Sequence, residues 1–134
     1  MSLYVLDTHV LLWLRGAKKE KFSKRVKKII EKFESKQAHF YIPATVIWEL
    51  GSLIKSGKLK LPKTSFRTWI KSILDYPNVI FVDTTLEDTL IAAELGINRD
   101  PCDNLIAATA IRLETPLITK DEAIKDSRTC EVIW

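Results

Sequence analysis

The sequence is poor in cysteine, glycine, proline and histidine, and each shortage excludes a class of protein. Its 134 residues include 2 cysteines, 4 glycines, 5 prolines and 2 histidines. Two cysteines are too few for a disulfide-stabilised scaffold or for a zinc site built from thiolates. So little glycine and proline excludes a collagen-like or low-complexity chain. What remains is an ordinary globular domain that folds without covalent cross-links.

Long apolar runs are also absent. One of the longest, Val10 to Leu14, has five residues, whereas a membrane-spanning helix needs about 20. The first residues lack the basic segment of a signal peptide, and Asp7 and His9 interrupt their apolar stretch. Hydrophobic residues nevertheless make up 46% of the chain, which is enough to build a core. We therefore expect a single cytoplasmic domain, residues 1–134, with no membrane partner.

Basic and acidic residues are separated along the chain. Residues 1–74 contain 16 basic and 5 acidic residues, whereas residues 75–134 contain 5 basic and 12 acidic ones. The basic half favours an anionic partner, and lysines of the helix expected over 23–35 are candidates for phosphate contacts. The alternative is that these lysines only keep a helix face solvated.

Short apolar runs alternate with stretches of helical periodicity. The predicted helices cover 10–14, 23–35, 43–57, 66–74, 86–95 and 101–114, and the predicted strands cover 3–6, 39–42, 79–82, 117–119 and 131–134. Glycine follows three of these helices, at 16, 57 and 96, where left-handed C-caps are expected. Continuously apolar strands between helices are typical of a parallel sheet covered on both faces. The predicted fold class is α/β.

Acidic residues follow two of the predicted strands. Asp7 comes directly after 3–6, and Asp121 follows 117–119 after one lysine. Ligands of open α/β sheets bind beyond the carboxyl ends of the strands, so these two carboxylates are expected to converge. The alternative is that each only caps the helix that follows. Asp83 also follows a strand, but Thr84 to Glu87 resembles a capping box, so Asp83 is left out of the site.

Two further acids lie on predicted helices. Glu49 flanks the apolar stripe of the helix that begins near Pro43, and a plain surface role is its alternative. Asp100 and Pro101 suit the N-cap and first position of a helix, which places Asp103 at the third position. There a favourable interaction with the helix dipole would also account for Asp103.

If these acids converge, they require a cation. Two carboxylates about 4 Å apart repel by about 4 kcal/mol at an effective dielectric constant of 20. Oxygen ligands without a histidine or cysteine set favour Mg²⁺ or Mn²⁺ over zinc. Such a site does phosphoryl chemistry by activating water and stabilising charge on the phosphate. The candidate catalytic and metal-binding residues are Asp7, Glu49, Asp103 and Asp121.

Four segments, in order along the chain, together resemble the PIN-domain family, and within it the VapC-type toxins of toxin–antitoxin pairs. They are LDTHVLLWL at 6–14, PATVIWEL at 43–50, RDPCDNLIAATA at 99–110 and LITKDE at 117–122. The family's four acids match Asp7, Glu49, Asp103 and Asp121, the last preceded by Thr119.

The resemblance implies an α/β/α sandwich with a parallel sheet of strand order 3-2-1-4-5. It also implies a Mg²⁺- or Mn²⁺-dependent ribonuclease, a homodimer, and a cognate antitoxin as partner. This sequence departs from the family at Asn104, where arginine is common, and at Cys102, where an aromatic or small residue is usual. These departures affect substrate contacts more than catalysis.

Two other hypotheses stay open at this point. One is a PIN module that binds RNA or a protein without cleaving. The other is a receiver-like phospho-acceptor domain, although that fold expects an acidic pair after its first strand, and here Thr8 and His9 follow Asp7. His9 is also close enough in sequence to Asp7 to support the site, with an ordinary structural role as its alternative.

Overall fold

A five-stranded, all-parallel sheet forms the centre of the protein. The computed structural model describes residues 2–16, 18–61, 63–97 and 100–134. The strands are β1 (Ser2–Leu6), β2 (Ala38–Pro43), β3 (Val79–Val82), β4 (Leu117–Ile118) and β5 (Val132–Ile133). Their order in the sheet is β3-β2-β1-β4-β5, as the family resemblance implied.

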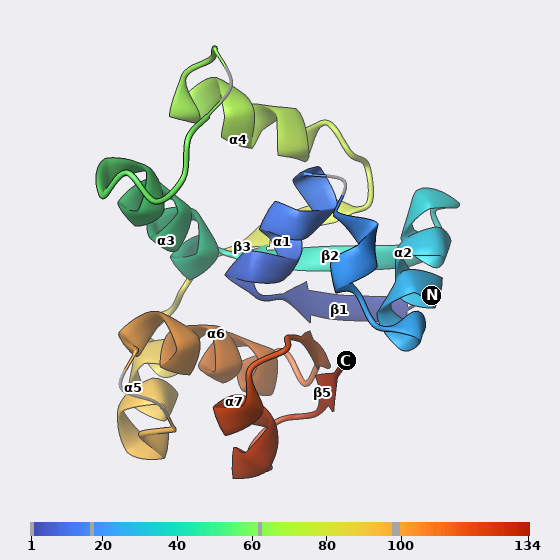
Figure 1. Ribbon diagram of the computed structural model, residues 1–134. Coiled ribbons are helices and arrows are strands. Elements are labelled where there is room, and N and C mark those ends of the chain that lie inside the picture. Colours follow the sequence, from blue (N-terminus) through green and yellow to red (C-terminus); the bar gives the residue numbers. More distant parts are fainter. Residues whose placement is uncertain (1, 17, 62, 98–99) are drawn as a thin grey trace.

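Helices lie on both sides of this sheet, with α1 and α4 on one side and α5, α6 and α7 on the other (Figure 1). The α/β sandwich is therefore confirmed. The helices are α1 (Thr8–Arg15), α2 (Lys24–Glu34), α3 (Ala44–Lys55), α4 (Phe66–Leu74), α5 (Leu86–Leu95), α6 (Pro101–Arg112) and α7 (Glu122–Ser127), with a 3₁₀ turn, η1, at Lys19–Lys21.

Three local predictions need correction. The sequence pattern did not predict α7 or η1, because segments of six and three residues are too short to show periodicity. Gly16 does not form a left-handed C-cap, since its φ is −82°, whereas Gly57 and Gly96 have φ of 77° and 52° as expected. The capping box before α5 pairs Thr85 with Asp88, one residue later than predicted.

The register of β1 against β4 positions two side chains of the candidate site. Leu6 is paired with Ile118, and the N–H of Asp7 donates to the Ile118 carbonyl at 3.2 Å. Asp7 and Thr119, the next residues along, therefore leave the carboxyl ends of neighbouring strands side by side. Helix α6 packs against α5 and α3, and its buried positions include the small residues Ala107, Ala108 and Ala110.

A buried ion pair joins α5 to α6. Asp88 is fully buried and accepts a hydrogen bond from Arg112 Nε at 2.5 Å and one from the Thr109 hydroxyl at 2.9 Å. Burial alone would raise the pKa of Asp88, but hydrogen bonds from Arg112, Thr85 and Thr109 outweigh it and hold that pKa below its ordinary value. The negative charge of Asp88 is therefore balanced within the chain by Arg112.

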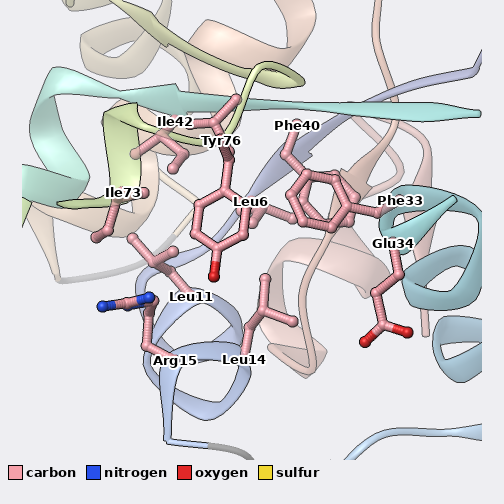
Figure 2. Close-up of a pocket in the computed structure, with 11 residues that line it drawn as sticks. Leu6, Leu11, Leu14, Arg15, Phe33, Glu34, Phe40, Ile42, Ile73 and Tyr76 are labelled. Atoms are coloured by element: carbon pink, nitrogen blue, oxygen red, sulfur yellow. The ribbon is translucent and has the colours of Figure 1, made fainter. Parts of the chain in front are cut away.

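A cavity of about 170 Å³, lined by apolar side chains together with Arg15 and Glu34, lies between α1, α2, α4 and the sheet (Figure 2). Its walls include Leu11, Leu14, Phe33 and Ile73, and the ring of Tyr76 points into it. It shares no residue with the acid-lined pocket described below. Within the described residues, no helix is long and apolar enough to cross a membrane.

Candidate metal centre

Asp7 lies between β1 and α1 and is 7% exposed. Its carboxylate accepts from the Thr8 N–H at 2.6 Å and from the Thr119 hydroxyl at 2.6 Å. Asp7 therefore caps α1, as the alternative interpretation held, and also lies at the carboxyl end of the sheet. Burial raises its pKa, the hydrogen bonds from Thr119 and Thr8 only partly offset this, and nearby Asp121 raises it further.

Glu49, from the middle of α3, lies close to the Asp7 carboxylate. The Thr8 hydroxyl donates to its Oε1 oxygen. Thr8 therefore contacts both acids, through its N–H to Asp7 and through its hydroxyl to Glu49. Burial is the largest cause that raises the pKa of Glu49, and the charges of Asp100 and Asp7 add to it. Thr8 was not among the predicted site residues, because its only signal in the sequence is its position directly after Asp7.

Asp103 enters from the first turn of α6. Asp100 caps this helix as predicted, because its Oδ1 accepts from the Cys102 N–H at 2.9 Å. Burial, together with the charges of Asp100, Asp7, Asp121 and Glu49, raises the pKa of Asp103 to about 7. Burial and like charges thus favour the protonated form of Asp103 in the absence of a bound cation.

Asp121 stands at the edge of the cluster. It caps α7, accepting from the Ile124 N–H at 2.9 Å, and its own N–H donates to the Thr119 hydroxyl at 3.1 Å. Since Thr119 also donates to Asp7, one hydroxyl links the acids that follow β1 and β4. Asp121 raises the pKa of both Asp7 and Asp103 by its charge.

The four predicted acids line one open pocket of about 360 Å³, which Asp100, His9, Trp13 and Lys120 also line. Within it, Asp7, Glu49 and Asp103 each offer an oxygen within 4.8 Å of the other two, which is a set that could hold a metal ion. Asp121 shares the pocket but lies outside this set of three. Three elements distant in sequence therefore supply convergent carboxylates.

A thiol lies at the same end of α6. Burial and the charges of Glu49, Asp100 and Asp103 raise the pKa of Cys102 to about 11. Cys102, Asp100 and Glu49 form a second convergent set, in which the donor atoms again lie within 4.8 Å of one another. In the sequence, Asp100 was predicted only as a cap and Cys102 only as a departure from the family, so the approach of both to Glu49 was not predicted.

Comparison with known proteins identifies the family of this chain. The model of the PIN domain matches residues 4–128. The chain belongs to the PIN-domain family. The match includes all four predicted acids.

Both the sequence and the fold of this PIN domain are similar to those of known proteins. Ribonuclease VapC22 of Mycobacterium tuberculosis (strain ATCC 25618 / H37Rv) is 26% identical over 129 residues, which are 96% of this chain and 94% of that protein. The structure of VapBC2 from Rickettsia felis bound to a promoter DNA fragment includes a chain with a TM-score of 0.66 and 18% identity, covering 98% of this chain and 97% of that one.

A further structure, FitAcB from Neisseria gonorrhoeae, has a TM-score of 0.62 and 18% identity, and covers 98% of this chain and 96% of that one. At such identities the structural likeness shows the fold alone. The strand order also disfavours the receiver-like hypothesis, because that fold has the order 2-1-3-4-5.

Proposed function

We propose that this PIN domain, residues 1–134, is a metal-dependent endoribonuclease that serves as the toxin of a toxin–antitoxin pair. Asp7, Glu49, Asp103 and Asp121 are its metal-binding and catalytic residues, and Mg²⁺ or Mn²⁺ is its metal. The observation that carries the proposal is the convergence of carboxylates from three separate elements within 4.8 Å.

The donors suit a hard divalent cation. They are all carboxylate oxygens, which Mg²⁺ and Mn²⁺ prefer. The raised pKa values of Asp7, Glu49 and Asp103 indicate that these acids are costly to ionise together without added positive charge. When bound, a divalent cation would lower the pKa of water and offset charge on the phosphate.

The residues around the acids fix their geometry. Thr119 orients Asp7 by donating to its carboxylate, and Thr8 orients Glu49 in the same way. Because both hydroxyls come from buried threonines, the two carboxylates are held in place before any ligand arrives. Lys120, exposed at the pocket, is placed to attract a phosphate.

A protein partner and a second copy are part of the proposal. The likeness to Ribonuclease VapC22 and to the VapBC structures, one of which is described as a member of a family of toxin–antitoxin systems, suggests a cognate antitoxin. Trp48 is 73% exposed, and tryptophan is one of the residue types enriched at protein interfaces. We expect a homodimer, which sedimentation of the purified chain would test.

A nuclease assay on pooled RNAs tests the proposed activity. Cleavage is expected with Mg²⁺ or Mn²⁺, and none with a chelator alone. Pooled single-stranded DNA of the same lengths serves as the substrate control. Binding of RNA without cleavage under any of these metals would favour the non-catalytic PIN module instead.

The antitoxin is tested separately. Co-expression with the product of the neighbouring gene should yield a complex in which cleavage is suppressed. A neighbour that neither binds the chain nor suppresses cleavage would contradict the toxin assignment, while leaving the ribonuclease activity as measured.

A further inference from the structure

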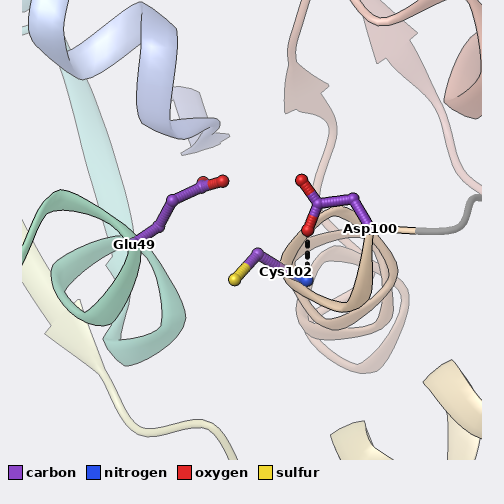
Figure 3. Close-up of side chains that lie close together, drawn as sticks. All are labelled: Glu49, Asp100 and Cys102. Carbon is purple, nitrogen blue, oxygen red and sulfur yellow. Dashed lines mark hydrogen bonds between the residues drawn. The ribbon is translucent and has the colours of Figure 1, made fainter. Parts of the chain in front are cut away.

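The second set of convergent donors differs in chemistry from the proposed catalytic set. Figure 3 shows Glu49 reaching from α3 toward the start of α6, where the Asp100 carboxylate and the Cys102 sulfur face it. The three donor atoms lie within 4.8 Å of one another. Two carboxylates and one thiol, from α3 and the start of α6, are therefore close enough together to bind one metal ion.

Fixed local geometry relates two of these donors. The Asp100 carboxylate accepts a hydrogen bond from the Cys102 N–H at 2.9 Å, which fixes this carboxylate beside the backbone that carries the thiol. Glu49 is the one long side chain of the set. Around a tetrahedral zinc ion the ligand atoms stand about 3.5 Å apart, given Zn–S of about 2.3 Å and Zn–O of about 2.0–2.2 Å. Zn²⁺ binding there requires the Glu49 carboxylate to turn from the Thr8 hydroxyl toward Asp100 and Cys102.

The sulfur decides which metal this set selects. Thiolate is a soft ligand, which Zn²⁺ accepts and Mg²⁺ does not, while carboxylates complete many zinc sites. Three protein donors leave a fourth position for water. The other set, Asp7 with Glu49 and Asp103, offers oxygen alone and so selects hard cations.

We propose that Glu49, Asp100 and Cys102 form a Zn²⁺ site, and that Zn²⁺ bound there takes Glu49 from the Asp7–Glu49–Asp103 set and inhibits cleavage. The inhibition rests on the proposed function, whereas the binding site does not. The chain would then carry two overlapping metal sites of opposite preference that share one carboxylate.

Cd²⁺ is the probe for the site itself, because its bond to a thiolate gives a charge-transfer absorption in the ultraviolet. The metal-free protein, kept reduced, should develop this absorption with one equivalent of Cd²⁺. Zn²⁺ should abolish it by competition, and a thousandfold excess of Mg²⁺ should leave it. Absence of the absorption would overturn the proposal.

Variants assign the ligands. Cys102→Ser should remove the absorption, whereas Cys130→Ser, which changes the other cysteine, should keep it. Asp100→Asn, in which asparagine still caps the helix, should weaken Cd²⁺ binding at least tenfold. Asp7→Asn should leave the absorption unchanged. Loss of the signal in Cys130→Ser or in Asp7→Asn would overturn the assigned ligand set.

Cleavage gives the second readout, with each variant compared with its own rate without zinc. Micromolar Zn²⁺ added to saturating Mg²⁺ should lower the rate at least tenfold in the wild type and in Cys130→Ser. It should change the rate less than twofold in Cys102→Ser. Equal inhibition of all three would overturn the inhibitory role. If no RNA is cut under any condition, the proposed function fails and the Cd²⁺ absorption alone decides the site.

Discussion

Asp7 and Asp88 are two buried acids in opposite electrostatic situations. Asp88 is fully buried and paired with Arg112, and its pKa is lowered. Asp7 is 7% exposed, its hydrogen-bond donors are the neutral groups of Thr8 and Thr119, and its pKa is raised. A buried acid whose cation belongs to its own chain serves the fold. A buried acid held only by neutral donors, among other acids, is organised for a ligand from outside.

The largest effect should come from Asp7→Asn, which removes charge but keeps shape. Cleavage should fall more than about a hundredfold, beyond the roughly 10- to 100-fold cost of losing a residue that only supports a metal ligand. Without metal, the melting temperature should stay level or rise, because repulsion among the acids is relieved. Rates of RNA cleavage and thermal melting measure the two effects.

Asp83→Asn is the matched control, because Asp83 also follows a strand but is exposed and lies outside the pocket. Asp83→Asn should change neither the rate of RNA cleavage nor the melting temperature. If the Asp7→Asn variant cleaved RNA at the wild-type rate in Mg²⁺, the acid cluster would not be the active site.

The reverse pattern is expected for Asp88→Asn. Breaking a buried ion pair costs about 3–5 kcal/mol, and the lower end applies because Arg112 is 27% exposed and can recover some solvation. Urea unfolding should therefore show a loss of about 3 kcal/mol, with cleavage by the folded fraction retained. Glu87→Gln, at an exposed neighbouring position on α5, should cost less than about 0.5 kcal/mol. A loss of less than about 1 kcal/mol in the free energy of unfolding of Asp88→Asn would show that the ion pair does not stabilise the fold.

The contrast between the two acids also marks what the sequence could predict. Asp7 and Asp121 follow apolar strands, and strand ends converge in a parallel sheet, so their meeting was predictable. Asp88 and Arg112 lie on different helices, and nothing local in the sequence pairs them. The proximity of Asp100 and Cys102 to Glu49 depends on how α3 packs against α6, which periodicity does not determine.

A smaller effect separates the two acids at the start of α6. Asp100→Ala should lower the free energy of unfolding by about 1 kcal/mol, because the hydrogen bond to the Cys102 N–H is lost. Asp100→Asn should restore most of this, since asparagine is a good N-cap. Asp103→Asn should not destabilise the metal-free protein, yet it should abolish cleavage. Urea unfolding of the three variants would reveal a reversed assignment if Asp103→Asn proved the costly change.

The pH dependence of stability follows from the same electrostatics. The pKa of Asp103 is raised from 3.8 to about 7 in the folded state, so the folded protein binds the extra proton. The stability this contributes is complete below about pH 4 and is lost as pH rises toward 7. Asp7 and Glu49, also with raised pKa values, act in the same direction. Asp88 acts in the opposite sense, but its contribution changes only below about pH 4.

The melting temperature of the metal-free protein should therefore fall between pH 5 and 7, and Asp103→Asn should reduce that fall. Saturating Mg²⁺ should cancel it at pH 7, because binding to the folded state adds stability. A metal-free wild type that melts at the same temperature as Asp103→Asn throughout this range would contradict the raised pKa.

The smallest effect concerns the basic half of the chain. Lys24, Lys27 and Lys28 are exposed on α2, whereas Lys120 is exposed at the acid pocket itself. For single strands, the logarithm of affinity falls with that of salt by about 0.7 per phosphate neutralised. In an Asp7→Asn background, which should not cleave, Lys120→Gln should flatten the slope by about 0.7. The triple change to glutamine should flatten it by up to about 2 if all three lysines meet phosphates. A slope that only Lys120→Gln alters would confine RNA contacts to the pocket and leave α2 as a solvated face.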